Sequence, residues 1–320
     1  MPPGRCALAV IRLPAGYGRV RLGRMIDELQ LRSLLSDHWG LDGAEVEPHH
    51  GGMNSATWFV THGGRRWVAK AVAAHNGPSF TAGMAVAEHL DEAGIAAGRP
   101  ERSRIDGRAV VQVDGVPLAL LRWVDGNPLR SAGPAEQALM GTMLALTHQA
   151  LRGFDVDGAI GWHWVEPDAA HLDLEPSIRK HVTAAAAALD AIDTGALTFG
   201  LLHADPAPEA FRLDPDTAAC GLIDWVGQRG PLLYDLASAL MYCGGPGRGD
   251  QLVKAYVSQG VVTAAEVELG LAALLRFRWA AQADYFARRI AEDDLTGIAD
   301  RSGNDKGLND ARHWLNMLSE

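Results

Sequence analysis

The spacing of apolar residues changes along the first 125 residues of this 320-residue chain. Between residues 25 and 39 apolar side chains recur every three or four positions and stop at Gly40, which predicts an amphipathic helix. Period-two segments and a second helix follow. The predicted strands are residues 55–61, 65–72, 109–113 and 116–124, with a helix over residues 80–93 between the two pairs. This order predicts a small lobe built around an antiparallel sheet.

Helical spacing dominates after the turn Asp125-Gly126-Asn127-Pro128. Thr263-Ala-Ala-Glu266 is a capping-box pattern and begins the longest of these stretches. The predicted helices are residues 134–151, 176–192, 235–242 and 263–289, and two short apolar segments lie between them, residues 199–202 and 220–226. The fold class is therefore α+β, with a sheet-bearing N-lobe and a mostly helical C-lobe.

Three segments follow from these patterns: residues 1–24, 25–125 and 126–320. We interpret residues 1–24 as an N-terminal extension and Met25 as the natural start, because helical periodicity begins there. Residues 6–11 form a short apolar run among arginines, but it is too short for a signal peptide and no clear cleavage site follows it.

Charge and cysteine content narrow the choice of partners. Thirty-nine acidic against 29 basic residues give a formal net charge of −10, which disfavours nucleic acid and anionic membranes and favours a cationic small molecule. The three cysteines, Cys6, Cys220 and Cys243, are odd in number and far apart, so we expect no disulfide framework. This favours a location in the reducing cytoplasm. Apolar runs fall short of the roughly 20 residues of a membrane span.

Two aspartates stand at the ends of short apolar segments. Asp205 closes Gly200-Leu-Leu-His-Ala-Asp205, and Asp224 lies nineteen residues later in Gly221-Leu-Ile-Asp-Trp-Val226. A carboxylate after a buried strand can accept a hydroxyl proton, and a second one nearby can hold a divalent metal on nucleotide phosphates. Two isolated aspartates can also simply cap turns.

Several motifs together resemble the aminoglycoside phosphotransferase and choline kinase-like family, whose fold is that of the protein kinases. The resemblance spans roughly residues 25–294. Its motifs are the nucleotide loop Gly51-Gly52-Met53-Asn54-Ser55, the strand lysine in Val68-Ala69-Lys70, the hinge Leu121-Arg122-Trp123-Val124-Asp125-Gly126, the catalytic loop His203-Ala204-Asp205, the metal motif Ile223-Asp224-Trp225 and the helix start Gly230-Pro231 to Ala237.

The resemblance implies a role for each motif. Asp205 would orient the acceptor hydroxyl and take its proton, and Asp224 would bind Mg²⁺ on the phosphates of ATP or GTP. The nucleotide-binding residues would be Gly51, Gly52, Asn54, Ser55, Lys70 and Trp123. Taken alone, the glycine pair can be an ordinary hairpin and Lys70 an edge-strand lysine in solvent. We expect His203 to brace the catalytic loop and Asp235 to cap a helix.

The chain departs from the family pattern at two positions. Ala210 stands where the family has a metal-binding Asn, and we hypothesise that Glu209 supplies the missing oxygen; the alternative is a solvated loop residue. Gly83 stands where a helix glutamate would pair with Lys70, and Glu88 is more than a turn away. Because of these two losses, the alternative interpretation is a degenerate kinase-like protein that binds a nucleotide or ligand without turnover.

The acceptor site is expected between the catalytic loop and C-lobe helices. Its candidate residues are Asp168, Asp173 and Glu175, the stretch from Arg276 to Arg289 with Gln282, Asp284 and Tyr285, and the acidic residues 292–294. Carboxylates beside aromatic rings suit a cationic acceptor, although a solvated helix face is the alternative. Residues 277–290 also look like the C-terminal helix of phosphotransferases that inactivate basic peptide antibiotics of the viomycin and capreomycin kind. We therefore expect antibiotic resistance, with a metabolic kinase for choline, an amino sugar or homoserine as the alternative.

Overall fold

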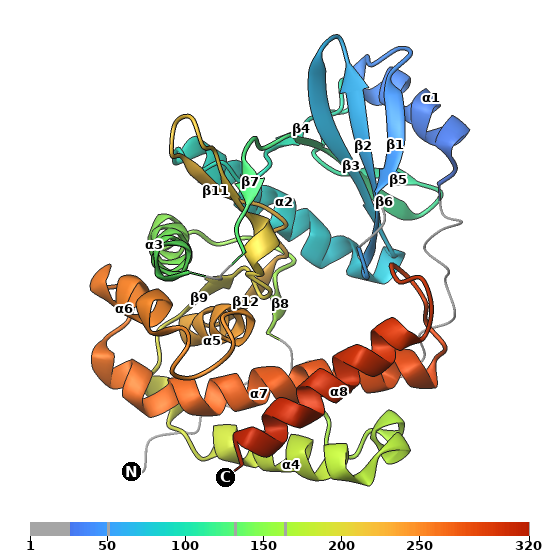
Figure 1. The fold of residues 1–320 in the computed structure, drawn as a ribbon. Coiled ribbons are helices and arrows are strands. Elements are labelled where there is room, and N and C mark those ends of the chain that lie inside the picture. Colours follow the sequence, from blue (N-terminus) through green and yellow to red (C-terminus); the bar gives the residue numbers. More distant parts are fainter. Residues whose placement is uncertain (1–25, 50–51, 131–132, 163–164, 320) are drawn as a thin grey trace, which may run out of the picture.

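The computed structural model describes residues 26–49, 52–130, 133–162 and 165–319, which form two lobes (Figure 1). Residues 1–25, which include the predicted extension and Met25, lie outside this part of the chain. The N-lobe sheet has the order β1-β2-β3-β6-β4, with β5 on β6, and every pairing is antiparallel. Its strands are β1 (Glu45–His49), β2 (Ser55–His62), β3 (Arg65–Val72), β4 (Pro100–Glu101), β5 (Val111–Val113) and β6 (Val116–Arg122).

The two faces of this sheet have different roles because side chains alternate along a strand. One face, with Trp58, Val60 and Ala69, forms a buried core with α1 (Glu28–Trp39). Phe59 and Val68 are cross-strand partners on the opposite face, which also carries Lys70. Strand alternation thus turns Lys70 away from the N-lobe core.

The C-lobe is mainly helical (Figure 1). Its helices are α3 (Pro134–Ala150), α4 (Pro176–Asp190), α5 (Leu232–Tyr242), α6 (Asp250–Ser258), α7 (Ala264–Ala291) and α8 (Ser302–Met317). Two small sheets lie among them, β11-β10-β7 and β8-β12-β9. Their strands are β7 (Asn127–Pro128), β8 (Ile160–Gly161), β9 (Phe199–Leu202), β10 (Phe211–Leu213), β11 (Cys220–Leu222) and β12 (Gln228–Pro231).

The predicted two-lobed α+β fold is confirmed, and most predicted elements occur within a few residues of their expected bounds. The capping box is present: Thr263 accepts from the Glu266 N–H, and the Glu266 carboxylate accepts from the Thr263 N–H. The sequence did not predict β1, α6, α8 or the short strands β4, β7, β8, β10 and β12. β1 has an almost fully exposed Glu-Val-Glu-Pro-His sequence, so it has no apolar alternation from which to predict a strand.

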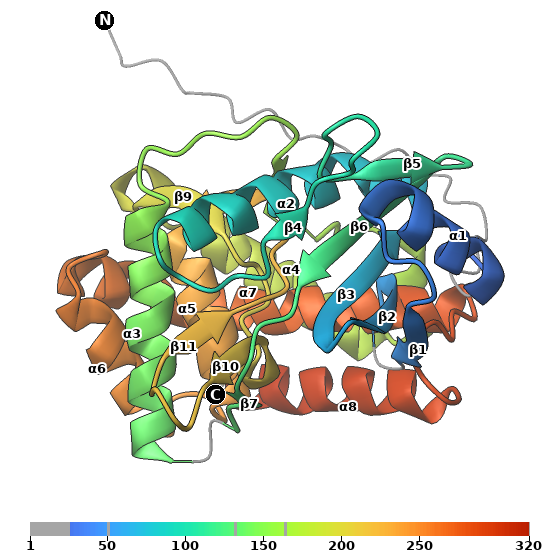
Figure 2. The same cartoon turned by 90° about the horizontal axis from the view of Figure 1, so that it is seen from above.

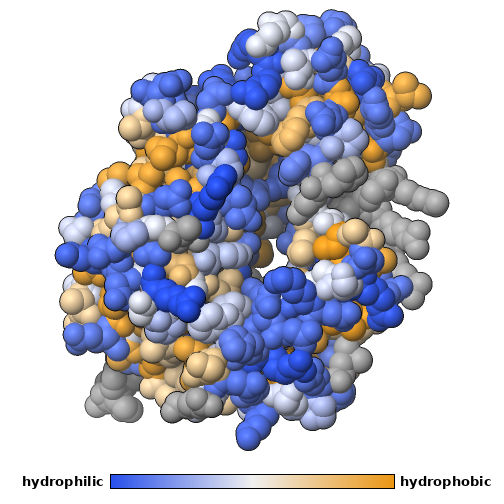
Figure 3. Space-filling model, viewed as in Figure 1, coloured by the Kyte–Doolittle hydropathy of each residue, from blue (hydrophilic) through white to orange (hydrophobic). Residues whose placement is uncertain are grey.

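Helix α2 (Gly77–Glu92) lies between the N-lobe sheet and the C-lobe, as the view from above shows (Figure 2). The surface is hollowed between the sheet-bearing part and the helical part in the space-filling view (Figure 3). None of the helices within the described ranges combines the length and the apolar character that a membrane span requires. Lys70 of the N-lobe sheet forms an ion pair with Asp224 of the C-lobe, so at least this pair of predicted site residues joins the two lobes.

Candidate active site

The loop after β9 presents Asp205. Ala204 has a φ of 75°, a left-handed conformation that a residue with a Cβ rarely adopts, so surrounding contacts must hold it. The carboxylate of Asp235 supplies them by accepting from the His203 N–H at 2.7 Å and the Ala204 N–H at 2.8 Å. The prediction that Asp235 caps a helix is wrong, because α5 already begins at Leu232 and Asp235 is fully buried.

A buried network extends this support into the C-lobe. His148 Nε2 of α3 lies 3.0 Å from Asp235 Oδ2, and its Nδ1 lies 2.7 Å from the hydroxyl of Tyr256 in α6. Burial strongly raises the pKa of Tyr256, with the Asp235 charge adding to the effect, so its hydroxyl stays protonated. The catalytic loop is therefore tied to two helices of its own lobe.

His203 links the two aspartate segments. Its Nε2 lies 2.8 Å from the carbonyl oxygen of Ile223, the residue before Asp224, and its ring packs against Trp225. The prediction that His203 braces the loop by hydrogen bonding is confirmed. Both contacts join the loop of Asp205 to the loop of Asp224.

Asp205 itself is exposed and has two polar neighbours. Its Oδ1 accepts from the Tyr242 hydroxyl at 2.6 Å and from Arg278 Nη2 at 2.9 Å. Its Oδ2 has no hydrogen bond within the described part of the chain, and the side chain as a whole is 60% exposed. One carboxylate oxygen is thus held and the other is available to a bound hydroxyl.

Lys70 and Asp224 form an ion pair across the lobes. The Asp224 side chain is 59% exposed, whereas that of Lys70 is 17% exposed. The Lys70 charge lowers the pKa of Asp224 and outweighs the opposing effect of burial. Asp224 has a φ of 74°, so its loop turns sharply after β11. The pair brings together the cation predicted to meet the phosphates and the carboxylate predicted to hold a metal.

Close packing explains the missing helix glutamate. A Cβ at Gly83 would lie 2.3 Å from the carbonyl oxygen of Trp225, and a Cβ at Gly227 would lie 2.2 Å from the Cβ of Ala82. Helix α2 therefore packs directly against the backbone that follows Asp224, which leaves no room for a glutamate at residue 83. Lys70 instead pairs with Asp224 directly.

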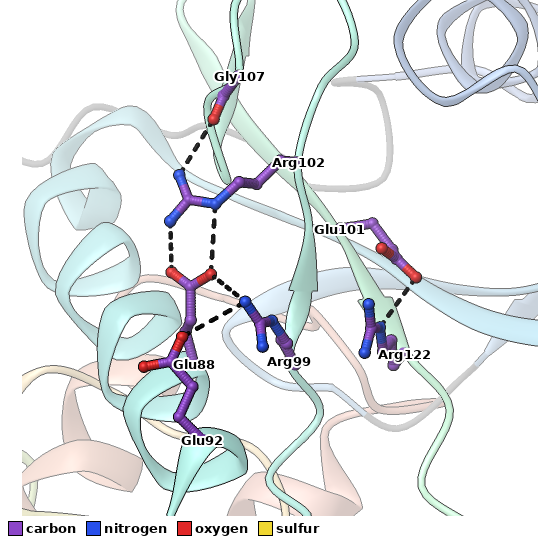
Figure 4. Close-up of polar contacts among 7 residues, drawn as sticks. All are labelled: Glu88, Glu92, Arg99, Glu101, Arg102, Gly107 and Arg122. Atoms are coloured by element: carbon purple, nitrogen blue, oxygen red, sulfur yellow. Dashed lines mark hydrogen bonds and ion pairs between the residues drawn. The ribbon is translucent and has the colours of Figure 1, made fainter.

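Glu88 does not replace that glutamate. Figure 4 shows it directed toward Arg102, which binds its Oε2 at 2.6 Å, and Arg99, which binds its Oε1 at 3.0 Å. Arg99 also reaches Glu92 at 3.5 Å, and a separate pair, Arg122 and Glu101, lies further along the sheet at 3.0 Å. These contacts fasten α2 to the segment around β4, away from Lys70.

The predicted nucleotide loop lies against the C-lobe. Gly51 is outside the described residues, but a Cβ on Gly297, between α7 and α8, would lie 2.5 Å from the Gly52 carbonyl oxygen (Figure 1). Asn54 Oδ1 accepts from the Tyr285 hydroxyl at 3.1 Å. Ser55 shares a 3.3 Å hydroxyl contact with Thr57. The structure thus joins Asn54 and Tyr285, which the sequence assigned to nucleotide and acceptor respectively.

The predicted hinge residue Trp123 lies at the edge of the lysine-bearing face of the sheet. Its ring meets Phe59 edge-on at 5.3 Å, and the Arg66 guanidinium lies 4.2 Å above it. Arg66 also pairs with Asp125 at 2.8 Å. Phe59, Val68 and Leu121 are in register on neighbouring strands, so this face offers an apolar surface next to Lys70.

The second predicted metal ligand stays a prediction. Glu209 is exposed on a short 3-10 helix (Pro208–Ala210) and has no hydrogen bond or ion pair within the described ranges. Ala210 is buried, and its carbonyl oxygen accepts from the Ile223 N–H at 3.0 Å. No group of three metal-ligating side chains occurs in the described ranges. The exposed carboxylates of Asp224 and Glu209 are hard oxygen donors of the kind Mg²⁺ accepts, so the residues fit such an ion.

Most of the acidic residues proposed for the acceptor site have partners in the protein. Asp284 is buried and lies 2.6 Å from His171 Nε2. Asp173 binds Arg179 at 2.5 Å, and Glu175 pairs with Arg312. Asp168 is exposed, and Gln282 is half-buried without a polar contact among the described residues. The acceptor roles of Asp168, Gln282, Asp284 and Tyr285 stay predictions.

The sequence did not predict Tyr242, Ser238 and Arg278 as the polar groups around Asp205, although Arg278 lies in the stretch proposed for the acceptor. A signal for Arg278 was present: Leu274, Leu275 and Ala281 occupy the same buried stripe of α7, so an arginine there interrupts an apolar face. A charged residue in such a stripe needs a polar partner, and here the partners are Asp205 and Ser238.

Solved structures with the same fold include several kinases. The microcompartment-associated aminopropanol kinase has a TM-score of 0.68 at 18% identity and covers 92% of this chain and 97% of its own. An amicoumacin kinase bound to AMP-PNP and Ca²⁺ has a TM-score of 0.69 at 14% identity, with 92% and 94% covered. At these identities the likeness establishes the fold, which is that of two-lobed kinases.

Curated relatives and a family model give a functional context. The homoserine kinases of Methylobacillus glycogenes and Azorhizobium caulinodans are 26% and 31% identical over 193 and 210 residues. Each match covers 59% of this chain and 60% or 64% of the relative, so it spans about three fifths of these relatives. The model of the phosphotransferase enzyme family matches residues 45–269. Because that match covers well over half of the chain, the protein belongs to the phosphotransferase enzyme family.

Proposed function

We propose that this protein transfers the γ-phosphoryl group of ATP or GTP to a hydroxyl group of a small-molecule metabolite. The observation that supports this most is the free Oδ2 of Asp205 on a loop that His203 links to the Lys70–Asp224 pair. A hydroxyl acceptor and a triphosphate would then be bound on adjacent loops, which is the positioning that phosphoryl transfer requires.

Each side chain has a distinct task in this reaction. Asp205 orients the acceptor hydroxyl through Oδ2 and takes its proton while the oxygen attacks the γ-phosphorus. Tyr242 and Arg278 hold the other oxygen of Asp205 in place. Lys70 neutralises phosphate charge from the N-lobe side. Asp224, with Glu209 as a second oxygen donor, would hold Mg²⁺, which supplies further charge neutralisation when bound.

The acceptor is proposed to be a metabolite because the matched curated relatives are homoserine kinases. A cationic antibiotic, with resistance as the role, is the second candidate. It is supported by the net charge of −10 and by the exposed carboxylate of Asp168. The pairing of Asp173, Glu175 and Asp284 with basic side chains favours the metabolite, since those carboxylates are already engaged.

We also propose that the protein acts in the cytoplasm, where nucleoside triphosphates and reduced thiols occur together. Cys220 and Cys243 are free, and burial raises the pKa of each thiol to about 11. Both thiols therefore stay protonated and unreactive at neutral pH.

A mass-spectrometric phosphotransfer screen tests the proposed function. The purified full chain is incubated with Mg²⁺ and ATP or GTP over homoserine, threonine, aminopropanols, choline, aminoglycosides and capreomycin. We expect a gain of one phosphate on one acceptor with the wild type and none with Asp205→Asn. Phosphorylation of the antibiotics alone would select the second candidate, and nucleotide binding without any product would overturn the proposal in favour of a binding protein without turnover.

A further inference from the structure

Arg278 of α7 is a fixed cation beside the proposed base. Its side chain is 12% exposed, and it donates through Nη2 to Asp205 Oδ1 at 2.9 Å and through Nε to Ser238 Oγ at 3.1 Å. The Ser238 hydroxyl in turn donates to the carbonyl oxygen of Tyr234 at 2.9 Å. The plane of the guanidinium is therefore set from two directions before any ligand binds.

The same guanidinium has donors to spare. An arginine side chain carries five N–H groups in a planar fork, and the two described bonds engage one each on Nε and Nη2. Nη1 makes no hydrogen bond within the part of the chain that the structure describes. It is also not one of the fully buried side-chain atoms that lack a partner. Arg278 can thus bind a second anion while it keeps hold of Asp205.

The charges around Arg278 disfavour a polycation at this place. Three of the acidic residues that the sequence offered for a cationic acceptor are paired elsewhere, Asp284 with His171, Asp173 with Arg179 and Glu175 with Arg312, whereas Asp168 is exposed. Tyr242, the other neighbour of Asp205, is neutral because burial and the Asp205 charge raise its pKa. The fixed positive charge next to the base is the Arg278 guanidinium, which attracts an anion. The acidic groups near it are Asp205, which it binds, and Glu209, whose charge acts on Tyr242.

We propose that the acceptor carries a carboxylate a few bonds from its reacting hydroxyl, and that Arg278 binds this carboxylate while the hydroxyl lies at Asp205 Oδ2. The planar fork of arginine matches the two oxygens of a carboxylate. This inference rests on the proposed function and narrows its substrate class to small hydroxy acids and hydroxyamino acids. In the reaction the acceptor oxygen bonds to the γ-phosphorus, the bond to the bridging β–γ oxygen breaks, and Asp205 takes the hydroxyl proton. The products are a phosphate monoester and a nucleoside diphosphate.

Two matched pairs of acceptors test the inference. L-homoserine and 3-amino-1-propanol differ only by the carboxylate, and so do L-threonine and 1-amino-2-propanol. Initial rates of phosphorylation are measured for the wild type, Arg278→Lys, Arg278→Met and Arg32→Met. Arg32 is the control, because it lies in an ion pair with Glu28 on α1. Circular dichroism and thermal melting establish that each variant is folded.

The wild type and Arg32→Met are expected to favour the carboxylate member of a pair by about 10- to 100-fold in kcat/KM, the range of a hydrogen bond to a charged group. Arg278→Met should raise KM for that member and leave KM for the amine almost unchanged, which removes the preference. Arg278→Lys keeps the positive charge, so it should retain part of the preference for the carboxylate member. A fall in kcat that is equal for both members of a pair reports the lost orientation of Asp205. The ratio of the two kcat/KM values cancels that fall and reports the carboxylate contact alone.

Three results would overturn the inference while leaving the proposed function intact. They are a wild-type preference for the decarboxylated amines, a preference for cationic antibiotics, and a preference that Arg278→Met does not change. If no acceptor is phosphorylated, the proposed function fails instead. Isothermal titration of L-homoserine into the wild type loaded with AMP-PNP and Mg²⁺ then decides: binding that Arg278→Met abolishes supports a carboxylate site, and absence of binding overturns it.

Discussion

The two proposed catalytic aspartates are held in different ways. Asp205 belongs to a loop fixed within one lobe, through Asp235 behind it and Tyr242 and Arg278 beside it. Asp224 is held through an ion pair to Lys70 of the other lobe, with a helix packed closely behind its loop. Hydrogen bonds within a packed lobe fix a geometry, whereas a half-exposed ion pair across a cleft can rearrange. The acceptor side is preorganised, and the phosphate side can adapt when nucleotide and metal bind.

The largest effect should come from Asp205→Asn, which changes only the base on the preorganised side. The amide keeps the shape of the side chain but cannot take the hydroxyl proton, so we expect kcat to fall by about 10²- to 10⁴-fold. Nucleotide affinity and melting temperature should change little. Steady-state kinetics with the acceptor found in the screen measure the effect. A variant with nearly full activity would mean that Asp205 is not the base.

Asp235→Ala should damage both the stability and the activity of the preorganised side. It leaves the His203 and Ala204 N–H groups and His148 without their buried partner. Losing one partner of a buried charged network costs about 3–5 kcal/mol, and we expect kcat to fall because Ala204 loses the contact that holds its left-handed conformation. Chemical denaturation measures the free energy of unfolding. Asp235→Asn keeps one acceptor oxygen, so its free energy of unfolding and its kcat should lie between those of the wild type and Asp235→Ala.

The sequence predicted the elements of the fold better than the contacts of the site. Thr263 and Glu266 are near neighbours in sequence, so their capping box could be read directly. Asp235 illustrates the opposite case: it lies in the first turn of α5, where a cap is an ordinary interpretation, but its partners come from β9's loop and from α3. Gly83 could be recognised as a departure, but its reason, contact with the Trp225 backbone, needed the packing of α2. Such contacts join segments far apart in sequence and leave no local pattern.

Lys70→Met should weaken nucleotide binding on the phosphate side without disturbing the acceptor side. It removes the cation expected on the phosphates, and the loss of a hydrogen bond to a charged group corresponds to about a tenfold to hundredfold rise in the nucleotide KM. The acceptor KM should stay within about twofold of the wild type. Lys306→Met is the matched control, since Lys306 lies in an exposed ion pair with Asp310 on α8. A rise in the acceptor KM alone would contradict the division between the two sides.

Gly83→Ala tests whether close packing positions the Asp224 loop. The added Cβ would meet the Trp225 carbonyl oxygen at 2.3 Å, so either the helix or the loop must move. Overpacking of this kind costs about 1–3 kcal/mol, which exceeds the gain in helix propensity of up to about 1 kcal/mol. We expect lower stability and a lower apparent affinity for Mg²⁺. Gly161→Ala is the control, because its Cβ would meet nothing within 4 Å. Equal melting temperatures for the two variants would exclude a role for this contact.

The smallest effect concerns the pH dependence of the Lys70–Asp224 pair in the absence of nucleotide. Lys70 lowers the pKa of Asp224 in the folded protein, so the pair stabilises the fold above the unfolded aspartate pKa of about 3.9. That contribution disappears as the pH falls through the lower folded-state pKa, where Asp224 takes a proton. The side chain of Asp224 is 59% exposed, so solvent screens the pair and the shift in melting temperature should be small. Melting curves of wild type and Asp224→Asn should differ at pH 7 and converge as the pH falls below about 4. A difference that persists in acid would mean that packing, and not charge, holds the phosphate side.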